Sequence, residues 1–140
     1  VFVASGGVSL AEELIKGAQL APWAALSLFL LICFFAGFVL DWISVLLIFI
    51  PVFIPIVKSM GYDPIWFCVM FLVVIQTSYL TPPMAPAIFY LRGISPPEIT
   101  LQHMFKGVVP FIFLQILCLG FVAYFPQMVL WLPSQLLRIN

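Results

Sequence analysis

The segment 76–91 can provide backbone carbonyl oxygens as ligands, because it carries three prolines within five positions. Its sequence is QTSYLTPPMAPAIFYL. A proline inside a helix has no N–H to donate and strands the carbonyl of the residue four positions earlier. Pro82 therefore frees the carbonyl of Ser78, and Pro83 frees that of Tyr79. These residues predict a short unwound segment whose carbonyl oxygens lack helical partners.

Thr81, which precedes the prolines, is expected to be extended and adds a hydroxyl to the freed carbonyls. Unpaired backbone groups are not tolerated against lipid, so such a segment must lie inside protein or at a cavity. Two outcomes are compatible with the sequence. Either the prolines only kink the helix and Ser78, Thr81 and water repair the lost bonds, or the freed oxygens coordinate a small hard cation. Sodium is the expected cation, because the oxygens are neutral and no carboxylate cluster is present for calcium.

Three other polar residues need separate consideration. Asp41 interrupts an apolar stretch, where a carboxylate costs about 2.5–3.5 kcal/mol, and it is a candidate ion ligand or the N-cap of the next helix. Gln76 lies one helical turn before the break and is expected to bond either substrate or a neighbouring helix. His103 is predicted to be interfacial and solvated. No nucleophile, base and orienting group occur together, so no enzyme activity is predicted.

The composition requires a lipid environment. Of the 140 residues, 65% are hydrophobic and 7% are charged, whereas soluble domains carry about 25% charged residues. The chain is therefore predicted to be an all-α integral membrane protein. Its net charge of zero offers no basic patch to nucleic acid. The cysteines Cys33, Cys68 and Cys118 lie singly in apolar runs and are predicted to be buried thiols without a disulfide, metal or cofactor role.

The transport region is expected to extend over residues 22–133. Residues 1–21 are predicted to form a short helix, opened by a capping box at Ser9–Glu12, and a connection, and residues 134–140 a C-terminal tail. Because the chain begins at Val1 without a methionine, we expect it to be part of a longer protein.

Prolines also shape the prediction for the first half of this region. The run 42–57 is too short for a comfortable straight span of a hydrocarbon core about 30 Å thick, and it contains Pro51 and Pro55. We therefore expect a re-entrant hairpin over about 37–58, with its tip near Pro51.

The second half is predicted to contain a broken helix over about 64–92. Gly61 can take a positive φ, Asp63 can cap the helix, and Pro64 suits the first helical position. Three further elements are expected, namely a capping box at Ser95–Glu98, an interfacial helix over about 96–106 and a last span over about 107–125. The lysines and arginines are spread too evenly to set the orientation.

Four motifs occur in an order and at spacings typical of one family. They are GFVLDW at 37–42, IFIPVFIPIV at 48–57, GYDP at 61–64 and the segment 76–91. Over about residues 22–133 the chain resembles the C-terminal part of the large (M, DctM-like) membrane subunit of tripartite ATP-independent periplasmic (TRAP) transporters. The mannitol/chloroaromatic-type branch is the most similar.

This resemblance implies the second inverted repeat of an elevator-type secondary transporter, with a re-entrant hairpin and a proline-broken helix. It implies a multi-pass protein of the bacterial inner membrane that imports an organic acid or related small solute by sodium symport. The implied partners are a periplasmic substrate-binding protein, a small membrane subunit (Q type, separate or fused) and the lipid bilayer.

The resemblance also implies an ion site. Its sodium ligands, mainly backbone carbonyls, would be Gly37, Ser78, Thr81 and Met84.

The residues implied in the vicinity of the substrate and ion are Asp41, Gln76, Thr77, Pro82 and Pro83. The chain departs from the family pattern at Ser78 and at Ala85, where glycine is common.

Two other functions are compatible with the sequence. One is a single-chain ion-coupled permease of the dicarboxylate or citrate type, and the other is a membrane scaffold that transports nothing. A scaffold would tolerate leucine at Thr81 and alanine at Pro82, whereas a transporter should not.

Overall fold

The computed structural model describes Gly6, Ser9, Glu13, Gly17 and residues 21–82 and 84–137. The predicted N-terminal helix with Glu12 of its capping box, Pro83 and the last three residues lie wholly or largely outside this part. From residue 21 to residue 137 the described chain is helical and contains no strand. Its helices are α2 (Pro22–Val39), α3 (Trp42–Ser59), α4 (Pro64–Leu80), α5 (Pro86–Ile94), α6 (Leu101–Tyr124) and α7 (Pro126–Leu137).

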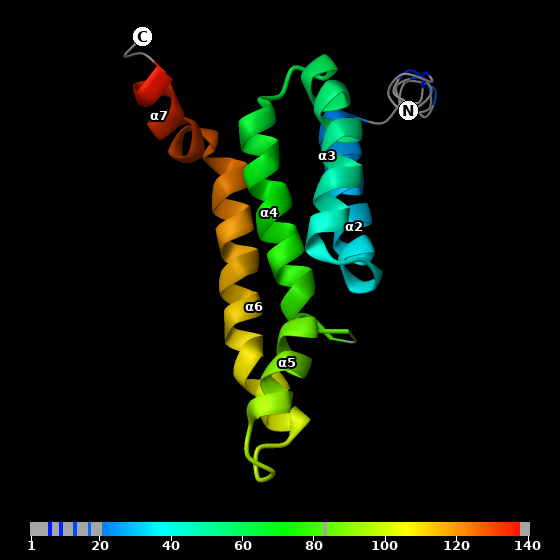
Figure 1. The fold of residues 1–140 in the computed structure, drawn as a ribbon. Helices are drawn as coiled ribbons and strands as arrows, with labels where there is room; N and C mark the ends of the chain where they lie inside the picture. Colours follow the sequence, from blue (N-terminus) through cyan, green and yellow to red (C-terminus); the bar gives the residue numbers. More distant parts are fainter. Residues whose placement is uncertain are drawn as a thin grey trace.

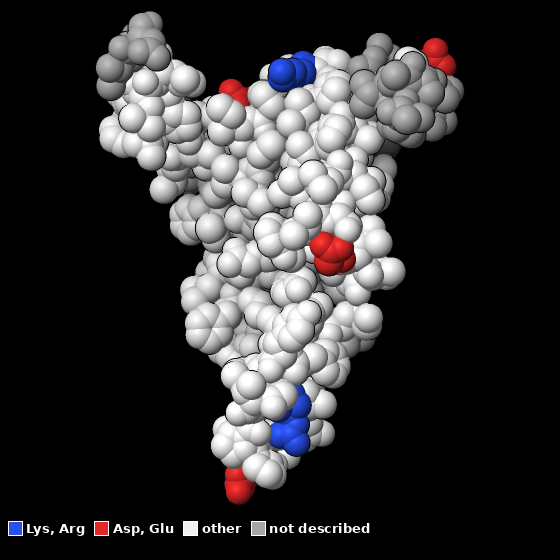
Figure 2. Space-filling view, viewed as in Figure 1, with Lys and Arg blue, Asp and Glu red and all other residues white. Residues whose placement is uncertain are grey.

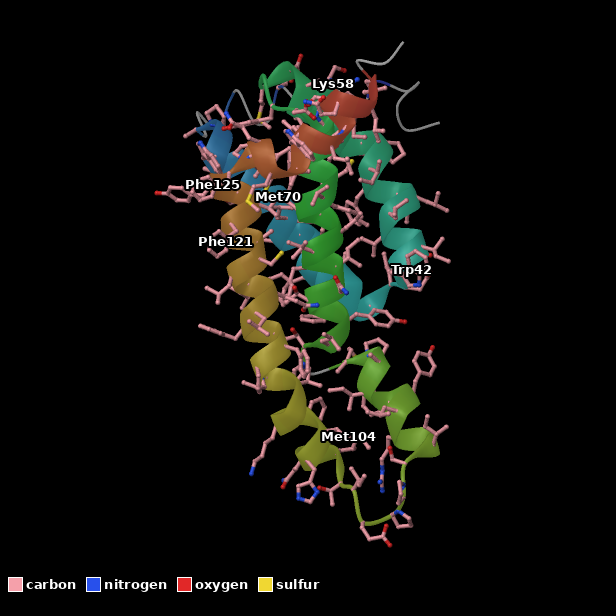
Figure 3. The ribbon with its side chains drawn as sticks, turned by 90° about the vertical axis from the view of Figure 1, so that its left-hand side faces the viewer. Trp42, Lys58, Met70, Met104, Phe121 and Phe125 are labelled. Carbon is pink, nitrogen blue, oxygen red and sulfur yellow. The ribbon has the colours of Figure 1, made fainter. Side chains whose placement is uncertain are left out.

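Helix α4 is the centre of the fold, and it contacts α2, α3, α5, α6 and α7 (Figure 1). Its side chains Phe67, Met70 and Phe71 are buried against α2 and α3, where the rings of Phe29 and Phe53 stack at 4.3 Å between centroids. A smaller cluster of Ala85, Ile88 and Met104 joins α5 to the start of α6. Figure 3 shows Met70 inside the bundle and Phe121 and Phe125 on its outside. α4 is thus held from several sides before the chain leaves the helix at residue 81.

The outer surface is apolar. Figure 2 shows a face almost free of charged side chains except toward the two ends of the molecule and at one acidic position between them. In the described part of the chain α2, α3 and α6 are long and apolar enough to cross a membrane, with mean hydropathies of 2.2, 2.2 and 2.1. The prediction of an all-helical membrane protein is confirmed at this level.

The α2–α3 hairpin differs from its prediction, because its turn lies at Leu40–Asp41 and not near Pro51. Helix α3 continues through Pro51 and Pro55 to Ser59. A proline deletes a single helical bond, and burial of Phe53 and its neighbours against α2 and α4 keeps the helix intact. Its 18 residues rise about 27 Å at about 1.5 Å each, so α3 is also longer than the sequence suggested. The tip near Pro51 was wrong, and re-entry into the membrane stays a prediction.

The start of α4 agrees with its sequence signals. Gly61 has a φ of +83°. The Asp63 carboxylate accepts bonds from the backbone N–H groups of Ile65 at 2.8 Å and Trp66 at 3.4 Å, and Pro64 is the first helical residue. The predicted roles of Gly61 before the helix, of Asp63 as its N-cap and of Pro64 as its first residue are therefore confirmed.

Helix α6 begins later and runs longer than predicted. Ser95 ends α5 rather than capping a new helix, and the Arg92 guanidinium binds the carbonyls of Pro96 and Ile99 in the connection. Thr100 forms the N-cap in a capping box with His103. The expected interfacial helix over 96–106 and last span over 107–125 are therefore one helix of 24 residues. The predicted Ser95–Glu98 box is wrong, because the Ser95 hydroxyl donates to the Leu91 carbonyl of α5 at 2.7 Å instead of capping a new helix.

Candidate ion site at the break between α4 and α5

The break extends from Thr81 to Ala85, between the last turn of α4 and the first turn of α5. Thr81 has φ −85° and ψ 132°, which confirms the prediction that it is extended. Ala85 has φ 31° and ψ 62°, a left-handed conformation that non-glycine residues rarely adopt. Glycine adopts this conformation without steric cost, whereas here an alanine adopts it.

The end of α2 lies directly against the end of α4. Gly37 and Ser78 are both buried. A Cβ placed on Gly37 would overlap the Ser78 hydroxyl oxygen and lie 3.1 Å from the Ser78 Cβ. A side chain at position 37 would therefore require the Ser78 hydroxyl to turn away and the two helices to shift, whereas glycine permits the approach as it stands. The structure therefore brings together two residues, 41 positions apart in sequence, that were predicted to share a site.

Hydroxyl groups line the end of α4 with their hydrogens already in use. Thr77 donates to the carbonyl of Val73, Ser78 to that of Ile75 and Thr81 to that of Thr77, each at 2.7 Å. A hydroxyl that donates its hydrogen still has lone pairs for a cation. The three oxygens are thus fixed as acceptors, which is the polarity that an ion site requires.

The carbonyls of the last turn are not equally available. The Ser78 carbonyl accepts a bond from the Thr81 N–H at 3.2 Å, so the prediction that Pro82 leaves it free is wrong. This bond forms because extended Thr81 still directs its N–H into the last turn. The Tyr79 carbonyl differs, since both residues that could serve it, three and four positions later, are prolines. It has no helical donor available.

Several of the other predicted site residues are exposed, unlike Gly37 and Ser78. Met84 is 50% exposed and Pro82 is also exposed, and Pro83 is outside the described residues. Asp41 is exposed and caps α3 by accepting bonds from the N–H groups of Ile43 at 3.1 Å and Ser44 at 3.2 Å. The capping role of Asp41 is confirmed. Among the described residues no cluster of three or more His, Cys, Asp or Glu could hold a metal, so any cation here relies on neutral oxygens.

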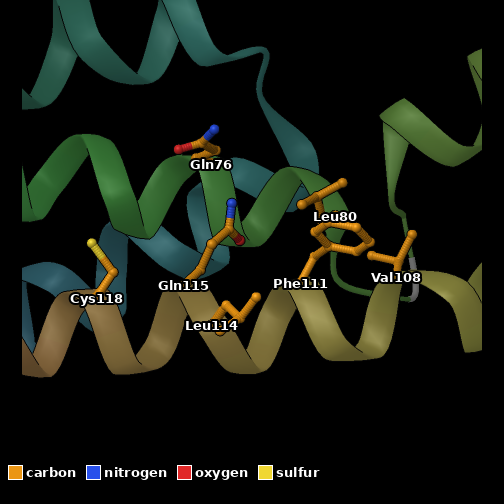
Figure 4. Close-up of a pocket in the computed structure, with 7 residues that line it drawn as sticks. All are labelled: Gln76, Leu80, Val108, Phe111, Leu114, Gln115 and Cys118. Atoms are coloured by element: carbon orange, nitrogen blue, oxygen red, sulfur yellow. The ribbon is translucent and has the colours of Figure 1, made fainter.

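Gln76 lies on another face of α4, where it borders grooves on two sides, one toward Trp42 of α3 and one toward α6. It lines a groove of about 430 Å³ together with Gln115 and Cys118 of α6 (Figure 4). The Gln115 Oε1 atom is buried and has no hydrogen-bond partner in the described structure. Gln115 was not among the predicted site residues, although it is the only amide within the apolar part of α6. Cys33 is a buried thiol as predicted, whereas Cys118 is exposed.

A second missed contact joins α4 to the junction of α6 and α7. The indole N–H of Trp66 donates to the Val122 carbonyl at 2.7 Å. Pro126, four residues after Val122, cannot supply the helical donor. The position of Pro126 marks the freed carbonyl in the sequence, but only the fold shows which group fills it.

Comparison with known proteins establishes the class to which this fold and break belong. The family model "Tripartite ATP-independent periplasmic transporter, DctM component" matches residues 1–128. The chain therefore belongs to the DctM family of TRAP transporter large permeases. These are transport proteins rather than enzymes, so the prediction of no enzyme activity is confirmed. No solved structure matches the chain.

Relatives with named solutes belong to several transport systems. The chain is 31% identical over 113 residues to the sialic acid TRAP transporter large permease SiaM of Vibrio cholerae, covering 81% of this chain and 26% of that protein. It is 28% identical over 125 residues to the C4-dicarboxylate large permease DctM of the same species, covering 89% and 27%. It is 29% identical over 94 residues to the 2,3-diketo-L-gulonate large permease YiaN of Escherichia coli, covering 67% and 22%. The chain thus spans under a third of the length of these relatives.

Proposed function

We propose that this chain is the C-terminal, ion-coupling part of a permease that imports an organic acid or related small solute with sodium. The observation that carries the proposal is the contact of Gly37 with Ser78 beside the Thr81–Ala85 break. In this assignment the ion lies among the carbonyls and hydroxyls at the end of α4, and Met84 contributes its carbonyl from the far side of the break.

Neutral ligands suit this role on physical grounds. A monovalent cation in a medium of low dielectric is stable only when several oxygens converge on it. The end of α4 offers the open Tyr79 carbonyl and hydroxyls whose hydrogens point elsewhere. Sodium binding there would bridge α2 and α4, which would couple the hairpin to the broken helix.

The wider proposal concerns the complete transporter. We assign the chain to the second repeat of an elevator-type, multi-pass permease of the bacterial inner membrane, in the mannitol/chloroaromatic-type branch. Its partners would be a small membrane subunit and a periplasmic binding protein that delivers the solute. Membership in the tripartite family supports the proposed partners, and the transport systems named for the relatives support import of an organic acid. The branch and the repeat rest on the four ordered sequence motifs.

Uptake into proteoliposomes tests the function. The full-length protein with its small subunit should accumulate at least one of sialic acid, succinate and 2,3-diketo-L-gulonate, only with an inward sodium gradient and the cognate binding protein. Uptake without the binding protein would favour the single-chain permease. Absence of uptake for all three, in vesicles where the assembled complex is verified, would count against import of these solutes and favour the scaffold.

A further inference from the structure

The groove between α4 and α6 has the size of a small-molecule site. Its volume of about 430 Å³ falls within the range of about 300–1,000 Å³ that ligand pockets occupy. Its walls are apolar side chains except for two amides and one thiol, which come from Gln76, Gln115 and Cys118. No charged side chain lines it. Figure 4 shows that its polar groups come from both helices.

Gln115 is the unusual member of this wall. It lies in a helix with a mean hydropathy of 2.1, and its Oε1 atom is buried without a partner in the described structure. A buried unsatisfied acceptor is destabilising, and polar groups within apolar spans are retained chiefly where they serve a pathway or a binding site. Rotation about its terminal torsion, which is broad for an amide, would turn this oxygen into the groove.

The two amides define the chemistry that the groove accepts. Each amide presents a donor and an acceptor, so together they match hydroxyl or amide groups. The groove contains no cation to pair with a carboxylate. Its occupant at this point is therefore neutral and polar.

The position of Gln76 links the groove to the proposed ion site. Gln76 and Ser78 are two residues apart, which places them about 200° apart around a helix. Ser78 faces Gly37 of α2, while Gln76 lines the groove toward α6. A single helical turn of α4 therefore faces both sites.

We infer that the α4–α6 groove is a solute subsite, in which Gln76 and Gln115 hydrogen-bond the uncharged, hydroxyl- or amide-bearing part of the transported organic acid. This inference rests on the proposed transport function and adds the substrate class. It selects hydroxylated acids over simple dicarboxylates.

Cys118 provides a reporter in the groove itself. In the full-length protein assembled with its small subunit, Cys33, Cys68 and any cysteines outside this chain are replaced by alanine. The rate at which a charged, membrane-impermeant methanethiosulfonate modifies Cys118 is then measured with sialic acid, 2,3-diketo-L-gulonate or succinate. We expect modification in the absence of solute, slowing by at least one of the two hydroxylated acids, and little slowing by succinate.

Two apolar variants test the amides, and a third serves as the control. Gln115→Met and Gln76→Met keep the side-chain length and remove hydrogen bonding, so each should raise the concentration of acid needed for protection by about 2- to 10-fold. Ile116→Met, which changes an exposed neighbour of Gln115, should leave protection unchanged. Using two variants keeps the test decisive if one of them does not fold.

Several results would overturn the inference. Modification by lipid-soluble reagents alone would mean a lipid-facing groove, and no modification at all would mean that another protein segment covers it. Failure of both hydroxylated acids to protect, equal protection by succinate, or unchanged protection in both methionine variants would exclude the subsite. If the groove fails these tests but uptake still depends on sodium, the proposed function stands and only the subsite is excluded. If the acids protect Cys118 but uptake does not depend on sodium, only the sodium coupling is excluded.

Discussion

Two proline positions in this protein have opposite consequences for the carbonyls that they free. Pro126 cannot bond the carbonyl of Val122, and the indole N–H of Trp66 fills that acceptor at 2.7 Å from across the bundle. The prolines after Thr81 leave the Tyr79 carbonyl with no helical donor, and the nearest hydroxyls already donate elsewhere.

The comparison separates a structural use of proline from a functional one. At the α6–α7 junction the missing donor is replaced by a side chain, so the kink becomes a tertiary contact. At the α4–α5 break the Tyr79 carbonyl stays without a helical donor, and it follows directly on Ser78, which is in close contact with Gly37. We therefore expect substitutions at the first position to change stability and substitutions at the second to change ion dependence.

The largest effect is expected from Gly37→Val. The added side chain would overlap Ser78 and force α2 away from α4. The sodium concentration for half-maximal uptake should rise by more than about 10-fold, equivalent to about 1.4 kcal/mol of binding. Gly107→Val is the matched control, because nothing lies within 4 Å of a Cβ at that helical glycine. Equal sodium dependence in the two variants would show that the α2–α4 contact does not form the site.

Trp66→Phe tests the α6–α7 junction, where the Trp66 indole serves the carbonyl that Pro126 frees. It leaves the Val122 carbonyl without its donor, and we expect the free energy of unfolding to fall by about 1–3 kcal/mol with unchanged sodium dependence. Denaturant unfolding in detergent measures the change, and Trp23→Phe, at an exposed tryptophan of the same aromatic cluster, is the comparison. A shift in sodium dependence without loss of stability would contradict the structural role of this bond.

Thr81→Val, at the α4–α5 break, should have a more moderate effect on sodium dependence than Gly37→Val. The variant keeps the side-chain shape and loses one oxygen, so the sodium concentration for half-maximal uptake should rise by about 2- to 10-fold. Thr100→Val removes a hydroxyl at the N-cap of α6 and should change stability alone. If Thr81→Val behaves like Thr100→Val, the Thr81 hydroxyl is not a ligand.

The smallest expected effect comes from Ala85→Gly. Alanine in the left-handed region costs about 1–2 kcal/mol, and glycine removes this strain but adds chain entropy of roughly 0.5–1 kcal/mol. The unfolding free energy should therefore rise slightly, with little change in sodium dependence. A fall in stability would mean that the Ala85 methyl, fully buried against Ile88 and Met104, contributes more than its strain costs.

Local chemistry was predictable from the sequence where it depends on neighbouring residues. The start of α4 at Asp63 and Pro64 and the extended backbone of Thr81 follow from caps and proline geometry alone. The Gly37–Ser78 pairing came instead from the family resemblance. Pro51 and Pro55 were misread because burial of α3 offsets their lost bonds, and this burial depends on helices distant in sequence.

Tertiary contacts could not be predicted in the same way. Trp66 and Val122 are separated by 56 residues, and the partner of a freed carbonyl is fixed only when α4 and α6 pack together. Gln115 was missed, and that it lines the same groove as Gln76 depends on the register of the same two helices.

Repairing the break tests the central claim most directly. Pro82→Ala with Pro83→Ala restores backbone N–H groups at both positions, including the helical donors that the Tyr79 carbonyl lacks. Pro126→Ala restores the helical donor for the Val122 carbonyl, which the Trp66 indole already serves. The midpoint of thermal unfolding is measured for both variants and the parent protein against sodium chloride, with choline chloride at equal ionic strength. We predict that sodium raises the midpoint of the parent and of Pro126→Ala and leaves the double variant unchanged. A double variant that folds and keeps the sodium-dependent rise of the parent would contradict the claim that the break forms the ion site.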